Sequence, residues 1–228
     1  MITVDQLTLE FDHRPAMSGE DFLVSPNNSE AVEWIDKWPD WSFVGICLFG
    51  PPGCGKTHLA EVFRAKSNAE IISFDRLLEV YQPPAGRAVI IEDVDQNLRS
   101  EHEEGLFHLY NGLKDQGGNL LITALVPPSR WEIELADLRS RLNTAAAVEI
   151  GPPDDGLIAA VLVKLFQDHQ IQVSSEVIKY AVSRMERSFA AARALVNASD
   201  KLALSEKKRI TVPLIKRVLK IFEQEGET

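Results

Sequence analysis

The chain has 228 residues, of which 45% are hydrophobic and 25% charged, with a formal net charge of −10. This composition is typical of a globular protein with one mid-sized domain, or a large and a small one, and the negative charge argues against sequence-specific DNA binding. Because no apolar run reaches the roughly 20 residues of a membrane helix, and no signal-like segment is present, we expect a cytoplasmic protein without membrane contact.

The first predicted element is the hexapeptide QLTLEF, residues 6–11, in which polar and apolar side chains alternate as in a strand. A charged stretch that contains proline follows it. Two interpretations stay open at this point. The hexapeptide is either an edge strand of the following domain or a short linear peptide that another protein binds.

Helical patterns then alternate with short apolar runs. Helices are predicted over 29–37, 56–66 and 103–118, and strands over 43–50, 70–74, 87–93, 119–126 and 146–151. A continuous apolar run that ends in Gly, such as 43–50, is typical of a strand buried on both faces. Strands that alternate with helices predict an α/β fold with a parallel sheet.

The pattern changes at the Pro-Pro-Asp-Asp turn, residues 152–155. Four helical patterns follow, over 157–169, 175–185, 188–205 and 212–224, with no credible strand among them. Their apolar stripes are most simply a mutual core. We therefore expect an α/β domain over 20–152 and a small all-α domain over 153–228.

The loop after the strand at 43–50 matches the phosphate-binding pattern G-x-x-x-x-G-K-[ST] at every fixed position. Its residues are Gly50, Pro51, Pro52, Gly53, Cys54, Gly55, Lys56 and Thr57. The glycines allow backbone N–H groups to turn inward around a phosphate, and the following helix N-terminus adds positive potential. Lys56 is expected to reach the β- and γ-phosphates and Thr57 to bind Mg²⁺. The motif predicts a P-loop that binds ADP or ATP with Mg²⁺.

The strand at 87–93 ends in Glu92-Asp93, where a P-loop protein needs acidic side chains near the metal. The usual order is Asp for the metal and then Glu to polarise the attacking water. Here the order is inverted, although both Glu92 and Asp93 stay candidates for the Mg²⁺ shell and Asp93 for the base. Nucleotide binding should survive this inversion, whereas fast hydrolysis by this chain alone is not expected.

The P-loop, the acidic pair, ITALVPP, LRSRL and the helical C-terminal part occur in the order found in AAA+ ATPases. From about residue 20 to 222 the chain resembles the nucleotide-binding domain of the DnaA replication initiators, which carries a helical lid. On this resemblance, EDFLVSPNN forms the adenine side of the site. The residues implied beside the P-loop are Leu23, Val24 and Asn28, together with His58 next to Thr57. Thr123 would be the polar sensor of the phosphates.

A chain with this domain and no counterpart of the initiator's DNA-binding domain is similar to Hda (HdaA), the regulatory homologue of DnaA, in its alphaproteobacterial form. Hda proteins bind the replicative sliding clamp through an N-terminal peptide and stimulate hydrolysis of the ATP held by DnaA. QLTLEF fits the clamp-binding pattern Q-x-x-L-x-F, with Gln6, Leu9 and Phe11 at the fixed positions and Leu7 also apolar. The resemblance therefore favours a clamp-binding peptide and linker over residues 1–19. The implied partners are the AAA+ domain of DnaA and the β subunit of DNA polymerase III, and a homodimer stays open.

Arg141 in LRSRL corresponds to the arginine finger that this family projects toward the nucleotide of a neighbouring subunit. Its guanidinium would stabilise charge that develops on the γ-phosphate, a contribution worth ~10³ to 10⁵ in rate when it is supplied in trans. A surface salt bridge with Asp137 is the structural alternative, and Arg139 is the competing candidate.

The chain also departs from the family pattern. Ala190 occupies the lid position where an arginine normally touches the phosphates, so Arg187 or Arg193 would have to substitute for it. Thr123 stands alone as the polar sensor in its strand. Together with the inverted acidic pair, these departures indicate a domain that holds its nucleotide as a structural ligand and acts in a partner's active site.

Two other functions stay open. A helicase loader, or another AAA+ ATPase that acts on DNA directly, predicts hydrolysis stimulated by DNA. A degenerate DnaA-like scaffold, bound to the clamp for localisation only, predicts that Arg141 is dispensable.

Overall fold

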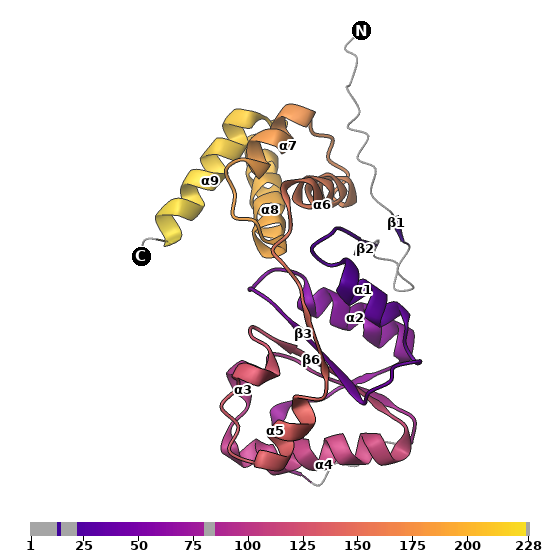
Figure 1. Cartoon of the computed structure of the whole chain (residues 1–228). Helices are drawn as coiled ribbons and strands as arrows, with labels where there is room; N and C mark the ends of the chain where they lie inside the picture. The colour runs from indigo at the N-terminus through magenta and orange to yellow at the C-terminus, as the bar shows by residue number, and fades with distance from the viewer. Residues whose placement is uncertain (1–12, 15–21, 80–84, 227–228) are drawn as a thin grey trace. The chain divides into compact units, whose positions relative to one another are not determined.

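The computed structural model describes residues 13–14, 22–79 and 85–226 (Figure 1). The chain divides into two compact units, one of which spans His13–Gly151 while the other begins at Pro152. Within the described ranges, no helix combines the length and the apolar character that crossing a membrane requires.

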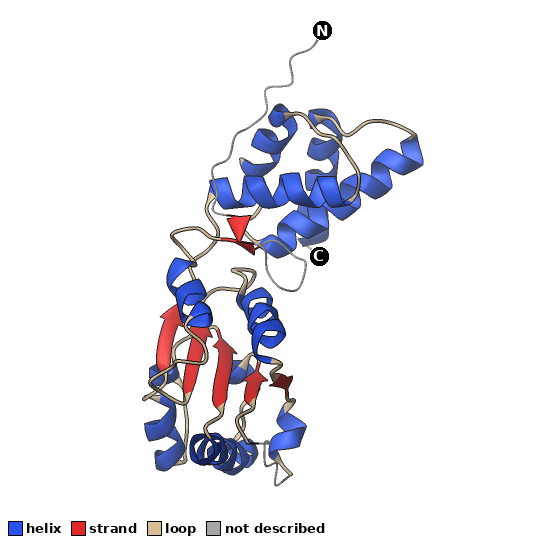
Figure 2. Ribbon diagram, turned by 90° about the vertical axis from the view of Figure 1, so that its right-hand side faces the viewer, coloured by secondary structure: helices blue, strands red, loops and turns tan. Residues whose placement is uncertain are grey.

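The larger unit is built on a five-stranded sheet with the strand order β4-β5-β6-β3-β7 (Figure 2). The strands are β3 (Gly45–Phe49), β4 (Glu70–Ile71), β5 (Ala88–Ile91), β6 (Asn119–Ala124) and β7 (Ala146–Glu149). Every pairing between neighbours is parallel. The prediction of an α/β domain with a parallel sheet is therefore confirmed.

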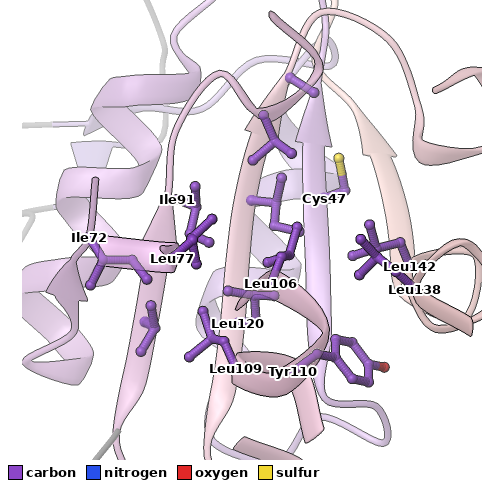
Figure 3. Close-up of a cluster of buried hydrophobic side chains, with 14 of the residues drawn as sticks. Cys47, Ile72, Leu77, Ile91, Leu106, Leu109, Tyr110, Leu120, Leu138 and Leu142 are labelled. Carbon is purple, nitrogen blue, oxygen red and sulfur yellow. The ribbon is translucent and has the colours of Figure 1, made fainter. Parts of the chain in front are cut away.

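Helices cover both faces of this sheet. Helices α1 (Ser29–Asp36) and α2 (Lys56–Ser67) cover one face, and α4 (Ser100–Gln116) and α5 (Ala136–Leu142) cover the other. The buried strand residues on the first face include Ile46, Leu48, Ile90, Leu121 and Val148. Those on the second face include Cys47, Val89, Ile91, Leu120 and Ile122, and Figure 3 shows part of this cluster. Because alternate side chains are buried on opposite faces, these strands appear in the sequence as continuous apolar runs.

Several short elements complete the unit without a clear signal in the sequence. They are α3 (Val94–Asn97), the 3₁₀ turns η1 (Phe74–Leu77) and η2 (Pro128–Arg130), and the antiparallel pair β1 (His13–Arg14) and β2 (Phe22–Leu23). The pair β1–β2 brings part of the segment expected to be linker next to the start of the domain. Helix α4 starts three residues before its predicted start and stops at Gly117, whose φ of 68° closes the helix in the left-handed conformation.

The second unit is helical throughout its described residues. Its helices are α6 (Asp155–Asp168), α7 (Ser175–Val182), α8 (Phe189–Glu206) and α9 (Val212–Gly226). Their apolar stripes form one shared core, which includes Leu162, Phe166, Ile178, Leu195 and Ile215. The predicted all-α character of this part is confirmed, because each helix is amphipathic and buries its apolar side against the others.

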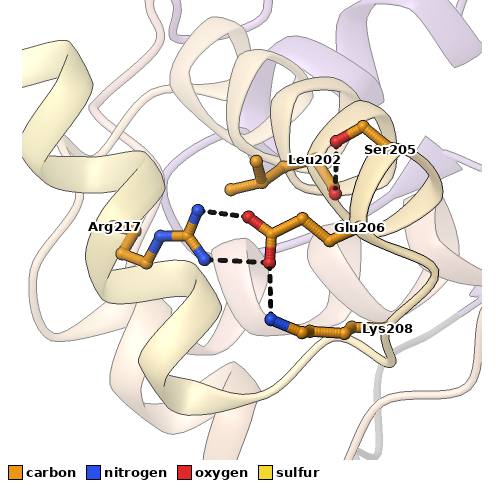
Figure 4. Close-up of polar contacts among 5 residues, drawn as sticks. All are labelled: Leu202, Ser205, Glu206, Lys208 and Arg217. Carbon is orange, nitrogen blue, oxygen red and sulfur yellow. Dashed lines mark hydrogen bonds and ion pairs between the residues drawn. The ribbon is translucent and has the colours of Figure 1, made fainter.

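An ion-pair cluster joins the end of α8 to α9 (Figure 4). The Arg217 guanidinium donates to both carboxylate oxygens of Glu206, and Lys208 Nζ donates to one of them at 3.0 Å. The hydrogen bonds from Arg217, and then that from Lys208, lower the pKa of Glu206 from its usual 4.5 to about 2. Both cations are exposed to solvent, which screens the attraction.

Candidate nucleotide site

The P-loop joins β3 to α2 at the edge of the sheet where the parallel strands end. Gly50, Gly53 and Gly55 have φ values of 155°, 73° and 106°. At Gly50, a Cβ atom would lie only 2.1 Å from the carbonyl oxygen of Ile150, so no larger residue fits there. Gly55 is the N-cap residue of α2, and the helix therefore begins directly at the end of the loop. The motif thus adopts the strand–loop–helix arrangement that phosphate binding by backbone N–H groups requires.

The Lys56 side chain folds back over this loop. Its ammonium nitrogen donates to the carbonyl oxygens of Gly50 at 2.8 Å and Pro51 at 3.1 Å, and the residue is only 7% exposed. A buried cation whose partners among the described residues are two carbonyls and a thiol, all uncharged, is poorly compensated, whereas phosphate oxygens supply charged acceptors. Lys56 is therefore positioned to exchange these carbonyls for the phosphates of a nucleotide.

The other side chains of the motif divide into one buried and several exposed. Cys54 is buried, with Sγ 4.0 Å from Lys56 Nζ, and burial raises the pKa of its thiol more than the nearby ammonium lowers it. Cys54 is therefore a neutral packing residue, whose backbone alone is available to a phosphate. Pro51, Pro52 and Thr57 are exposed. Exposure of Thr57 is required if its hydroxyl is to bind a metal ion. His58 follows on α2 and is half-buried.

The acidic pair and Thr123 lie at the same edge of the sheet. The Asp93 N–H donates to Thr123 Oγ1 at 3.0 Å, and Thr123 is fully buried. Asp93, two residues after the end of β5, is the N-cap residue of α3 and has φ 52°. Because the Thr123 hydroxyl accepts from this backbone N–H, it keeps its own proton to donate. Thr123 thus connects the ends of β5 and β6 beside the P-loop.

The residues at this edge fit a magnesium ion. Glu92 Oε1 is buried and has no hydrogen-bond partner among the described residues, as expected for a carboxylate oxygen that binds a cation or water. The described residues contain no group of three or more His, Cys, Asp or Glu side chains placed to hold a metal. Mg²⁺ usually binds through one or two protein ligands, phosphate oxygens and water. Glu92 and Thr57 would hold the ion, which when bound neutralises charge on the phosphates.

The segment predicted to line the adenine side is held by Asn28. The Asn28 side chain is 5% exposed, donates to the Leu23 carbonyl at 3.1 Å and accepts from the Ser25 N–H at 2.8 Å. Leu23 is buried, and Val24 packs against the cluster under α1 and α2. Both polar atoms of Asn28 therefore shape this segment, and the contact of Leu23, Val24 and Asn28 with a nucleotide stays a prediction.

Asp95 has a role at this edge that its sequence position did not reveal. Its Oδ2 accepts from the backbone N–H groups of Leu125 at 2.8 Å and Val126 at 3.0 Å, so α3 is tied to the end of β6. Its Oδ1 is buried without a hydrogen-bond partner among the described residues. Burial, and to a smaller extent the Asp95 charge, raises the pKa of the Cys47 thiol to about 12.

Arg139 and Arg141 belong to the short helix α5. Leu138 and Leu142 anchor this helix in the core, while Arg139 is exposed and Arg141 is half-buried. Neither arginine forms an ion pair with any residue that the structure describes, so the alternative of a salt bridge to Asp137 is not realised. No hydrogen bond among the described residues joins the Arg141 guanidinium to the P-loop.

The candidate residues of the C-terminal part belong to the helical unit. Arg187 donates to Asp155 at 2.6 and 3.3 Å, and these hydrogen bonds lower the pKa of Asp155. Arg193 is exposed on α8 without an ion-pair partner among the described residues, and Ala190 is exposed nearby on the same helix. A phosphate contact by Arg187 would therefore require it to leave Asp155. The residues predicted to bind the clamp, 6–11, lie outside the described part of the chain.

Comparisons with known proteins agree with this arrangement. Residues 46–124 match the family described as ATPases associated with various cellular activities, and residues 155–219 match the family described as the lid domain of Hda. The DnaA domain III structure from Thermotoga maritima superposes with a TM-score of 0.77 at 19% identity, over 88% of this chain and 94% of that one. The fold and the P-loop therefore define a AAA+ nucleotide-binding protein with a helical lid.

The sequence relatives narrow this class. An uncharacterized Haemophilus influenzae protein is 27% identical over 191 residues, which cover 76% of this chain and 80% of that protein. The DnaA initiators of Thermomicrobium roseum and Caulobacter vibrioides are 27% and 26% identical, over 90% and 91% of this chain. The matched region spans only about half of each initiator, 50% and 49%. The chain is a AAA+ protein related to Hda and DnaA.

Proposed function

We propose that this protein is an Hda-type regulator of replication initiation, which stimulates hydrolysis of the ATP held by DnaA and so prevents over-initiation. The observation that carries the proposal is the match of residues 155–219 to the Hda lid, on a chain whose other relatives include DnaA initiators. The proposal has three parts: a bound nucleotide, an arginine that acts in trans, and a tether to the sliding clamp.

The first part is an adenine nucleotide held with Mg²⁺ as a structural ligand. Support comes from the P-loop geometry, from the buried Lys56 ammonium and from the unpartnered oxygen of Glu92. The inverted order of Glu92 and Asp93 disfavours rapid hydrolysis in this chain, because each carboxylate differs by one methylene from its usual counterpart. The bound nucleotide then stabilises the fold rather than turning over.

The second part is Arg141 as an arginine finger toward the nucleotide of DnaA. A guanidinium without a carboxylate partner keeps its donors free for phosphate oxygens, and a rigid anchoring helix lowers the entropy lost when it binds. Arg141 has no carboxylate partner among the described residues, and the buried Leu138 and Leu142 anchor its helix in the core. Arg139 is the natural comparison, since it lies on the same helix but is exposed, whereas Arg141 is half-buried.

The third part is attachment to the β sliding clamp through residues 6–11. We expect Leu9 and Phe11 to fill an apolar pocket on the clamp, with Gln6 hydrogen-bonded at its rim. Such a tether raises the effective concentration of this protein near DnaA at the replication origin or fork without any new contact between the two.

The test is a measurement of ATP hydrolysis by DnaA in the presence of this protein and DNA-loaded clamp, with each component omitted in turn. Arg141→Ala should reduce the rate to that of DnaA alone, while Arg139→Ala, the matched control, should retain most of the stimulation. Replacement of Leu9 and Phe11 by Ala should abolish the effect of the clamp. If the wild-type chain leaves DnaA unaffected, the regulatory function is wrong, and DNA-dependent hydrolysis by this chain alone would favour the helicase-loader alternative.

A further inference from the structure

Helix α5 is too short to hold its own orientation. It has seven residues, Ala136–Leu142, and isolated helices below roughly 12 to 15 residues are marginal in water. Its direction and its rotation about its axis must therefore be set by tertiary contacts. This matters because the proposed arginine finger lies in its last turn.

The rotation of α5 decides which arginine it presents on a given side. Leu138 and Leu142 face the core. At 100° per residue, Arg139 and Arg141 lie roughly 80° to either side of this buried stripe. A rotation of the helix would therefore move one guanidinium toward a partner and the other away from it. Two leucines in an apolar core resist such a rotation only through shape, because apolar contacts have no direction.

A buried carboxylate forms directional hydrogen bonds with the backbone at the start of α5. Glu103 of α4 is only 4% exposed, although its side chain ends in a carboxylate. Its Oε1 accepts from the Glu134 N–H at 3.1 Å and its Oε2 from the Leu135 N–H at 2.7 Å. These are the two residues that immediately precede α5. Because both oxygens are used, the contact fixes the direction of the chain as well as its position.

A second contact from α4 holds the C-terminal end of α5. The Thr144 hydroxyl donates to the carbonyl oxygen of Arg141 at 2.6 Å and lies 3.2 Å from the Tyr110 hydroxyl. Since a threonine hydroxyl has one proton, Tyr110 is the donor in the second contact. Tyr110 follows Glu103 by seven residues, which places both on the same face of α4. Figure 3 shows the Tyr110 ring in one cluster with Leu138 and Leu142.

We propose that Glu103 is a positioning residue for Arg141. The Glu103 carboxylate, with Tyr110 at the opposite end, sets the direction and rotation of α5 so that Arg141 rather than Arg139 is presented to the nucleotide of the partner. This inference rests on the proposed function. Glu103 is not among the predicted site residues, although its position three residues before the buried Leu106 is a signal that it lies on the buried side of α4.

The experiment measures the stimulation of DnaA ATP hydrolysis against the concentration of this protein. Glu103→Gln keeps the shape, but its amide nitrogen would face one of the two backbone N–H donors, so one of the two hydrogen bonds to residues 134 and 135 is lost. It should lower the maximal rate about 10- to 100-fold, as expected for a misplaced catalytic group, while the half-saturating concentration and nucleotide binding stay unchanged. Tyr110→Phe should lower the maximal rate in the same way. Glu104→Gln, at the adjacent exposed position, is the control and should match the wild-type chain.

An unchanged maximal rate with Glu103→Gln would overturn the proposal. A purely structural role would also overturn it, and this would appear as an equal loss of stimulation and of nucleotide binding. Amide hydrogen exchange separates this result from failure of the proposed function. Even if the wild-type chain does not stimulate DnaA, Glu103→Gln should raise exchange in 134–144 and leave α2 unaffected, and unchanged exchange in 134–144 would refute the positioning role.

Discussion

Replacing Gly105 by Ala tests how α4 is seated against the rest of the core. From the sequence alone this change should stabilise the protein, because glycine inside a helix costs about 1 kcal/mol relative to alanine. The structure predicts the opposite. An alanine Cβ at this position would lie 1.8 Å from the carbonyl oxygen of Leu77 and 2.6 Å from its carbonyl carbon. Because non-bonded carbon and oxygen atoms do not approach so closely, α4 and η1 would have to separate by about 1 Å or more.

Two opposing effects determine the change in the free energy of unfolding for Gly105→Ala. Overpacking of a core costs roughly 1 to 3 kcal/mol, and the upper part of this range, about 2 to 3 kcal/mol, applies here because the obstacle is backbone, which cannot turn away as a side chain can. The gain in helix propensity offsets about 1 kcal/mol of this cost. We therefore expect Gly105→Ala to reduce the free energy of unfolding by about 1 to 2 kcal/mol, which corresponds to a decrease in Tm of roughly 2 to 8 °C.

The assay is thermal unfolding followed by circular dichroism at pH 7. Glu104→Ala, at the neighbouring exposed position of the same helix, is the control and should shift Tm by less than about 2 °C. A Tm for Gly105→Ala equal to or above that of the wild-type chain would refute the reasoning, because it would mean that α4 and η1 can separate at no cost.

Three further predictions concern single side chains. Lys56→Ala should weaken nucleotide binding by about 10- to 150-fold in a calorimetric titration, since one charge-assisted hydrogen bond is worth about 1.5 to 3 kcal/mol, and unaltered affinity would contradict the role of its ammonium. Cys47 should resist alkylation by iodoacetamide at pH 8 until the protein unfolds, because its pKa of about 12 leaves almost no thiolate. The Glu206 pKa is lowered on folding, so its contribution to stability is present above about pH 4.5 and is lost toward pH 2. Glu206→Gln should thus lower the Tm of the helical unit at pH 7 but not at pH 2, and an equal shift at both would exclude the ionic cause.

Local patterns predicted the framework of the nucleotide site correctly. The apolar run before Gly50 predicted β3, and the motif that follows predicted the loop and the start of α2, because spacing and glycine content act over a few residues. The same patterns located Glu92 and Asp93 at a strand end. They contained no information on the order of the strands, since the choice of neighbours in a parallel sheet depends on contacts between distant segments.

Polar side chains on the buried faces were the least predictable. The contact of Asn28 with the nucleotide stays a prediction, but the sequence did not indicate that its polar atoms hold the Leu23–Asn28 turn. Asp95 and Glu103 appeared as ordinary acidic residues, yet each accepts two backbone hydrogen bonds from a segment about thirty residues away in the chain. A hydrogen-bond acceptor at such a distance leaves no periodic pattern in the sequence.

The sequence by itself determined that this protein has a parallel α/β domain with a P-loop, followed by a helical domain, because hydrophobic periodicity and the glycine motif are local properties of the chain. Only the tertiary structure decided how those parts are held. The close contact of Gly105 with Leu77, the two hydrogen bonds of Glu103 and the unpaired state of Arg141 among the described residues all depend on which segments meet in three dimensions. Packing, rather than helix propensity or charge spacing, therefore sets the sign of a substitution at Gly105 and the direction of α5.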